Sequence, residues 1–75
     1  MTLYIEPKEN CSIQDANFYK NTKYRAVVVD YWKDADNDKS ILGLRVTGGH
    51  YRIKIVAITQ GELFDKFNVK KEDEE

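Results

Sequence analysis

The sequence is short of cysteine, proline and histidine, with one of each among 75 residues, and it contains no long apolar run. Because Cys11 is alone, the chain cannot form an internal disulfide, which excludes a disulfide-stabilised secreted scaffold. A membrane-spanning helix needs about 20 consecutive apolar residues, and no run approaches that length. The amino-terminal residues also lack the basic and apolar regions of a secretory leader. We therefore expect a cytoplasmic protein with no membrane partner.

Sets of residues with the spacing of a catalytic site are also missing. His50 is the only histidine, and as a general base it would need a partner such as Cys11 or Asp30. The simpler interpretation makes His50 a turn residue and Cys11 a small, half-buried side chain. We predict that the protein is not an enzyme and has no catalytic residue and no cofactor.

One acidic segment has an incomplete resemblance to a calcium-binding loop. Residues 34–40 place oxygen-bearing side chains at alternate positions, as such loops do. However, the sixth position is Lys39 where glycine is needed, and the twelfth is Arg45 where a bidentate carboxylate is needed. We expect no metal site, and instead a solvated loop whose Asp and Asn side chains accept hydrogen bonds from nearby backbone amides.

What the sequence does contain is a strong pattern of β-strands in its middle part. Residues 51–55 alternate apolar and charged side chains, as a strand with one solvated face does. Gly48-Gly49 precedes them and suits a two-residue hairpin turn, because glycine adopts positive φ angles without steric cost. The apolar run Ala26–Val29, which contains three β-branched valines, predicts a central strand covered on both faces. The pattern predicts an antiparallel meander of three strands over residues 23–33, 40–47 and 50–58.

The first quarter of the chain carries weaker signals. Residues 2–6 predict a short strand that ends at Pro7, which cannot donate to a ladder. Ser12 followed by Asp15 resembles the start of a helix. One or two helical turns are therefore expected over residues 13–19, with three side chains turned inward: Ile13, Ala16 and Tyr19.

The C-terminal part has the pattern of a capped helix. Thr59-Gln60-Gly61-Glu62 is a capping box, in which the Thr59 hydroxyl accepts a hydrogen bond from the Glu62 amide. A helix over residues 60–67 would also allow an i,i+4 ion pair between Glu62 and Lys66. Its apolar face would consist of Leu63, Phe64 and Phe67.

Together these elements predict one compact domain over residues 1–69 and an acidic, solvated tail over residues 70–75. The expected class is α+β dominated by β: a small twisted antiparallel sheet of three to four strands, which can curl into a partial SH3-like barrel, with the C-terminal helix packed on it. This outline is similar to chromo-like and SH3-like domains. The sequence carries no diagnostic motif of either group, so the likeness transfers no functional residue.

The net charge of −1 combines a basic body with an acidic end. Four of the 13 acidic residues lie in Glu72–Glu75, which leaves nine against 12 basic residues and a charge of +3 for residues 1–71. That excess falls short of the basic patch typical of a dedicated nucleic-acid binder.

Aromatic and basic residues gather on the expected strands. Tyrosine, tryptophan and arginine are enriched at protein interfaces, and aromatics on a sheet can also stack bases. The predicted partner-binding residues are Arg25, Tyr31, Trp32, Arg52 and Lys54. A competing placement, which we favour over base stacking, puts Tyr24, Trp32 and Tyr51 in the core, because aromatics supply much of the buried area of a small domain.

The expected function is that of a small non-enzymatic module that binds and modulates or inhibits a larger protein. Frequent Lys, Ile, Asn and Tyr suggest an AT-rich coding sequence, which fits an accessory or inhibitor factor of a phage or mobile element. The alternative is nucleic-acid binding by a small β-barrel protein through a face led by Arg25, Arg52 and Lys54. Self-association through an edge strand is also open.

Overall fold

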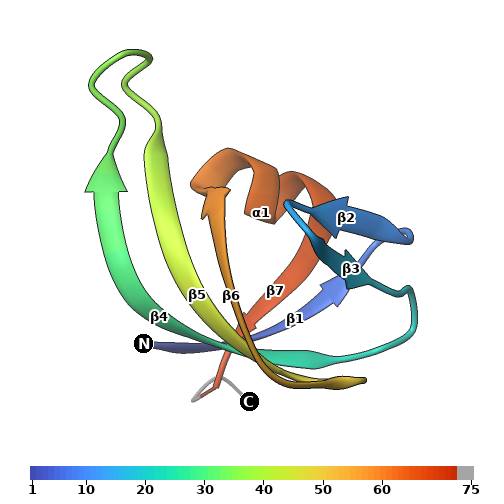
Figure 1. Cartoon of the computed structure of the whole chain (residues 1–75). Coiled ribbons are helices and arrows are strands. Elements are labelled where there is room, and N and C mark those ends of the chain that lie inside the picture. Colours follow the sequence, from blue (N-terminus) through green and yellow to red (C-terminus); the bar gives the residue numbers. More distant parts are fainter. Residues whose placement is uncertain (73–75) are drawn as a thin grey trace.

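The strand pattern is realised as one five-stranded antiparallel sheet and a separate hairpin in a computed structural model that describes residues 1–72 (Figure 1). The sheet has the order β6-β5-β4-β1-β7 and is not closed, because its end strands β6 and β7 do not pair with each other. The β-dominated class is confirmed, with five strands in the main sheet where three to four were predicted. The elements are β1 (Thr2–Pro7), β2 (Cys11–Ile13), β3 (Ala16–Phe18), β4 (Tyr24–Lys33), β5 (Ser40–Gly48), β6 (Tyr51–Thr59), α1 (Gln60–Lys66) and β7 (Phe67–Lys71).

The predicted meander is confirmed as β4, β5 and β6. Its glycine hairpin turns one residue later than expected, because Gly48 still pairs with Tyr51 and the turn consists of Gly49 and His50. Both glycines have positive φ angles, 115° and 55°. A Cβ atom on Gly49 would lie 2.8 Å from the ring of Tyr24, so this position requires glycine for space as well as for conformation.

The predicted helical turns over residues 13–19 are wrong. The segment is the β2–β3 hairpin, with Gln14 (φ 55°) in its turn. The Ser12 hydroxyl does not cap a helix but donates across the hairpin to Oδ1 of Asn17 at 2.6 Å. Because strand residues alternate between faces, Phe18 is buried, and Tyr19, which a helix would have turned inward, is 46% exposed.

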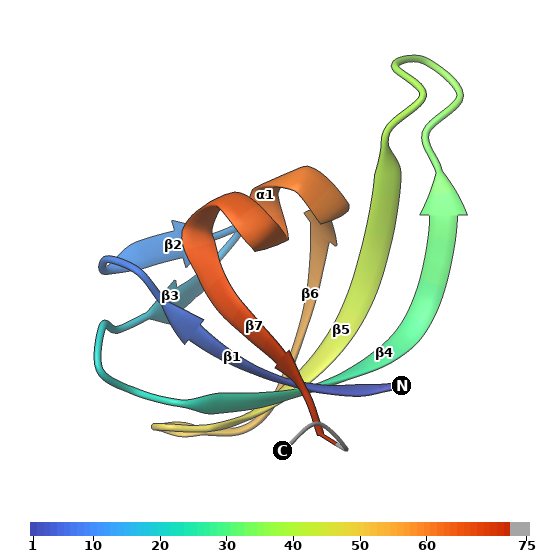
Figure 2. The ribbon, with the colours of Figure 1, turned by 180° about the vertical axis from the view of Figure 1, so that it is seen from behind.

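The capped helix is confirmed, and it is shorter than expected. The Thr59 hydroxyl accepts from the Glu62 amide at 3.1 Å, and Lys66 pairs with Glu62 at 3.1 Å. The chain then continues as β7, which pairs with β1 and which the sequence did not predict (Figure 2). Part of the predicted acidic tail therefore belongs to the sheet, and residues 73–75 lie outside the described residues.

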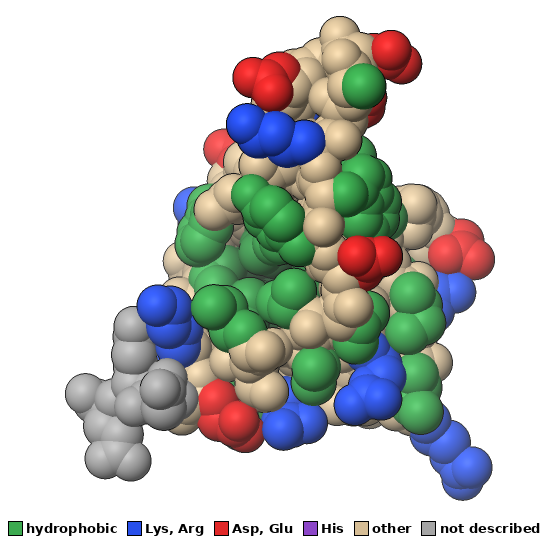
Figure 3. All heavy atoms as spheres, turned by 90° about the vertical axis from the view of Figure 1, so that its left-hand side faces the viewer, with side chains coloured by type: hydrophobic (Ala, Val, Ile, Leu, Met, Phe, Trp, Pro, Cys, Tyr) green, Lys and Arg blue, Asp and Glu red, His purple; other side chains and the backbone are tan. Residues whose placement is uncertain are grey.

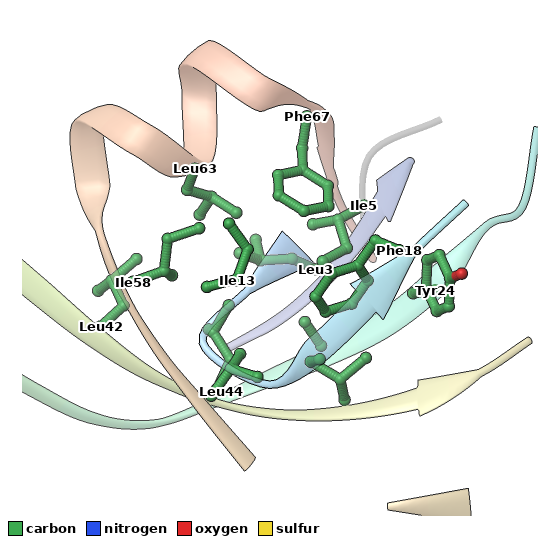
Figure 4. Close-up of a cluster of buried hydrophobic side chains, with 14 residues drawn as sticks. Leu3, Ile5, Ile13, Phe18, Tyr24, Leu42, Leu44, Ile58, Leu63 and Phe67 are labelled. Atoms are coloured by element: carbon green, nitrogen blue, oxygen red, sulfur yellow. The ribbon is translucent and has the colours of Figure 1, made fainter. Parts of the chain in front are cut away.

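The core lies between the curved sheet, the β2–β3 hairpin and α1 (Figure 4). Phe18 is at its centre, with ring centroids 5.0 Å from Tyr24 and 5.3 Å from Phe67, both in edge-to-face arrangements. No polar or charged side chain of residues 1–72 is buried. The core consists of Leu3, Ile5, Ile13, Ala16, Phe18, Tyr24, Ala26, Leu42, Leu44, Val46, Val56, Ile58, Leu63 and Phe67.

Candidate binding surface at the open half of β4

Strand β4 changes its surroundings halfway along its length. Its first half pairs with β5 on one side and with β1 on the other, and this second ladder ends where the Val28 amide donates to the Met1 carbonyl at 2.9 Å. Among residues 1–72, residues 30–33 pair only with β5, and Val29 has no paired residue. In Figure 1 this half of β4 forms the left-hand margin of the sheet. The molecule therefore has a free strand edge of five residues.

A β-bulge marks the point at which the edge becomes free. The register with β5 shifts between Val28 and Asp30, which leaves Val29 as the extra residue and 53% exposed. The prediction that this run is covered on both faces is therefore wrong. Beyond the bulge, successive side chains point to opposite faces: Tyr31 (57% exposed) lines a groove, and Trp32 (41% exposed) lies on the other face.

Trp32 is thus not part of the core, which corrects the favoured placement of the three aromatics. Its ring lies over Gly43 of the neighbouring strand, where a Cβ atom would be 3.6 Å away. Tyr24 is fully buried as expected, and Tyr51 is partly buried against the core. Among residues 1–72 only β5 pairs with this half of β4, so Trp32 has a neighbouring strand on one side only.

The groove beside Tyr31 has a volume of about 460 Å³, within the range of ligand pockets. Figure 3 shows it as a hollow surrounded by hydrophobic side chains, seen from the left-hand side of Figure 1. Phe64 stands at its rim and is 52% exposed, although the sequence predicted it on the buried face of the helix. The lining residues are Met1, Leu3, Val28, Tyr31, Leu42, Gln60, Leu63, Phe64, Val69 and Lys71.

The groove has few polar side chains, and the hydroxyl and amide of Tyr31 are already hydrogen-bonded. The Tyr31 hydroxyl donates to Oγ of Ser40 at 3.0 Å. The Tyr31 amide donates to the carboxylate of its neighbour Asp30 at 2.8 Å. Lys71 carries the only charged side chain in the lining, and it forms no ion pair within residues 1–72. Among the side chains of residues 1–72, the groove is therefore apolar apart from Lys71, which has no ion-pair partner there.

The predicted partner-binding residues do not form one surface. Tyr31 and Trp32 belong to the open half of β4, and their side chains point to opposite faces. Arg25 pairs with Glu72, with 3.3 Å between Nε and Oε1, and Lys54 pairs with Asp15 at 3.1 Å. Arg52 is exposed near the β5–β6 turn.

The Lys54–Asp15 contact has an electrostatic consequence. The hydrogen bond and positive charge of Lys54 hold the pKa of Asp15 below its usual value. Because Lys54 lies opposite the buried Val46, it sits at the margin of the core-facing side and not in an open basic strip. The two cations on β6 are therefore in different environments.

The two residues considered for catalysis lie in separate settings. Burial raises the pKa of the Cys11 thiol; the positive charge of Lys66 opposes that shift, and Glu62 adds to it. The thiol is therefore protonated at neutral pH and weakly nucleophilic. The His50 ring packs against Tyr51, with 4.0 Å between centroids.

The acidic loop between β4 and β5 hydrogen-bonds to its own backbone, as expected. The Asp36 amide donates to Oδ1 of Asp34 at 2.9 Å, and the Lys39 amide donates to Oδ1 of Asn37 at 3.1 Å. Within the described part of the chain, no three Cys, His, Asp or Glu side chains converge as metal ligands. The loop is a set of Asx turns at the tip of the β4–β5 arm.

The groove residues Met1, Phe64 and Val69 were not predicted as functional. They lie far apart in the sequence and come together only in the folded chain, so periodicity along the chain gave no signal. Over residues 1–72 no helix has the length and apolarity to cross a membrane. Comparison with models of protein families, with curated proteins and with solved structures found no significant match.

Proposed function

We propose that the protein is a small non-enzymatic module that binds a larger protein through the groove and the free edge of β4, and thereby modulates or inhibits it. The observation that carries this proposal is the coincidence of an unpaired strand edge with an apolar groove whose rim residues are exposed. Exposed apolar patches on small domains mark interaction sites, and methionine and aromatic side chains are typical of interface centres.

The proposal also includes a more specific fold type, a cellular setting and an origin for the protein. The strand order, together with a helix of seven residues before the last strand, supports an SH3-like partial barrel. The lone cysteine supports a reducing, cytoplasmic setting. The phage or mobile-element origin rests on amino-acid usage alone.

Nucleic-acid binding is the second candidate, because Trp32 is exposed and could stack on a base. The ion pairs of Arg25 and Lys54 reduce the charge available to phosphates. Exposed pairs of this kind contribute little to stability and can exchange partners. An affinity that falls steeply with added salt would favour this candidate.

The test is a pull-down from lysate with the purified chain, with nuclease-treated and untreated halves run in parallel. Wild type is compared with Phe64→Glu, at the rim of the groove, and with Ile53→Glu, a matched change at an exposed position on β6. Circular dichroism first establishes that both variants are folded.

The proposal predicts one stoichiometric protein that survives nuclease, is lost with Phe64→Glu and is retained with Ile53→Glu. Recovery that disappears with nuclease would move the function to nucleic acid. Loss with Ile53→Glu alone would contradict the groove as the binding surface.

A further inference from the structure

We propose that the groove takes an extended segment of the partner, which pairs as an additional strand with residues 29–33 of β4 and places a carboxylate against Lys71. This inference rests on the proposed protein-binding function and specifies its partner. The added strand would lie beside residues 29–33 of β4, beyond the Val28–Met1 hydrogen bond at which the β1–β4 ladder ends.

The backbone of β4 provides the first argument. An edge strand presents unpaired N–H and C=O groups, and pairing with an incoming strand satisfies them. The Tyr31 amide belongs to this edge, because its hydrogen bond goes to the side chain of Asp30 and not to a strand. Asp30 therefore holds the place that a carbonyl of the incoming strand would take.

The side chains beside the edge provide the second argument. Neighbouring strands lie about 4.8 Å apart, and alternate residues of a strand point to the same face. On one face the groove offers the exposed side chains of Tyr31 and Phe64 to every second residue of an added strand. On the other face the exposed Val29 and Trp32 would flank the intervening residues. An added strand thus meets apolar contacts on both of its faces.

The charge of the lining determines the chemistry of the partner. Covering the groove removes Lys71 from water, and a buried ammonium group without a partner is costly in free energy. No carboxylate within residues 1–72 forms an ion pair with Lys71. The bound segment should therefore carry Asp or Glu on its groove side, together with aliphatic residues.

A second copy of this chain fits less well. If the β4 edges of two copies paired, the side chains of Tyr31 and Lys33 of the second copy would lie on the groove face. Asp30 and Trp32 of that copy would point to the opposite face. That arrangement adds a cation beside Lys71 and no carboxylate. The favoured occupant is a different protein.

The test uses the full chain and a displayed library of random twelve-residue peptides. The tag is placed at the C-terminus, because residues added before Met1 would run along the β4 edge. Peptides that require Phe64 are synthesised with single N-methyl groups at each position in turn. Strand pairing predicts losses of about tenfold or more at every second position and small effects between them, since one backbone hydrogen bond is lost each time.

Three variants separate the contribution of the Lys71 charge to peptide binding from that of the β4 edge. With Lys71→Glu, peptides that carry Asp or Glu should bind about tenfold more weakly, and a new selection should yield Lys or Arg at that place. Lys70→Glu is the control, because Lys70 lies opposite Tyr4 and not in the groove. Asp30→Ala removes the local acceptor of the Tyr31 amide, so peptides should bind several-fold more tightly.

If N-methylation weakens the binding of Phe64-dependent peptides without a period of two residues, the added strand is wrong. The proposed protein-binding function would still hold in that case. Equal effects of Lys71→Glu and Lys70→Glu would overturn the carboxylate. A wild-type dimer in sedimentation that Tyr31→Glu dissociates would assign the edge to a second copy. If no peptide depends on Phe64, the proposed groove function fails as well.

Discussion

The two halves of β4 each contain one tyrosine, and the two tyrosines have different surroundings. Tyr24 in the first half is fully buried between two strands, and its hydroxyl accepts from the Tyr19 amide at 3.0 Å. Tyr31 in the second half has β5 on one side and solvent or the groove on the others. The same residue type is a core residue in one half and a surface residue in the other. The neighbour on the β1 side decides the difference.

This comparison indicates where stability and binding reside. The first half contributes to the core, where one aromatic side chain is worth several kcal/mol. The second half has exposed apolar residues and a free edge that contribute little to folding. Substitutions in the two halves should therefore separate the stability of the protein from its binding.

The largest effect is expected from Tyr24→Ala. Removal of the buried ring should cost about 3–5 kcal/mol, which exceeds or matches the few kcal/mol of stability typical of a domain this small. Tyr31→Ala should cost less than about 1 kcal/mol, because the side chain is largely exposed. Urea denaturation followed by circular dichroism measures the loss for Tyr31→Ala, and the spectrum without urea shows whether Tyr24→Ala is still folded. Similar losses for the two tyrosines would contradict the contrast between the halves.

A smaller effect is expected at the hairpin glycine that touches Tyr24. Gly49→Ala adds a methyl group at φ 55° and 2.8 Å from the ring, which should destabilise the protein by about 1–3 kcal/mol. The control is Gly61→Ala in α1, where nothing lies within 4 Å of the added Cβ. That change should stabilise by up to about 1 kcal/mol. A stabilising Gly49→Ala would show that the turn differs from the one described.

The helix that borders the groove depends on its cap. Thr59→Ala removes the acceptor of the Glu62 amide and should cost about 1 kcal/mol. Because α1 supplies Phe64 to the groove rim, the same variant should also weaken partner binding. Thermal unfolding and a binding titration measure the two effects, and Thr59→Ser restores both if the hydroxyl is responsible.

The smallest effect concerns pH. The pKa of Asp15 is lowered in the folded state by Lys54, so the ionised carboxylate favours folding above the unfolded-state pKa. That contribution is lost as the pH falls through the folded-state pKa. The Asp15 carboxyl titration, followed by NMR, should move upward in Lys54→Met. No shift in that variant would show that the pair does not form in solution.

The sequence predicted the parts of the fold that depend on local patterns. The alternation in residues 51–55 correctly predicted β6, and the capping box at Thr59 correctly predicted the start of α1. The β2–β3 hairpin was mistaken for a helix because Ser12 and Asp15 mimic a cap over only a few residues. Strand β7 was missed because Phe67 and Val69 give too short an alternation, and pairing with β1 is a long-range contact.

The candidate surface was predicted only in part. Tyr31 and Trp32 were selected by residue type, and both are exposed beside the free edge. The groove could not be predicted from the sequence. It forms where the β1–β4 ladder ends and where α1 and β7 lie beside the unpaired half of β4, which are all long-range contacts. The bulge at Val29 also changes which residues of β4 share a face, and no local sequence pattern predicted the bulge.

The central claim is that the open half of β4 and its groove form the binding surface. The most direct test is a titration of the ¹⁵N-labelled chain with the captured partner or a selected peptide, followed by amide chemical shifts. The claim predicts that the shift changes concentrate in residues 29–33, 60–64 and 69–71. Changes centred on Arg52 and Ile53, with β4 unaffected, would contradict it.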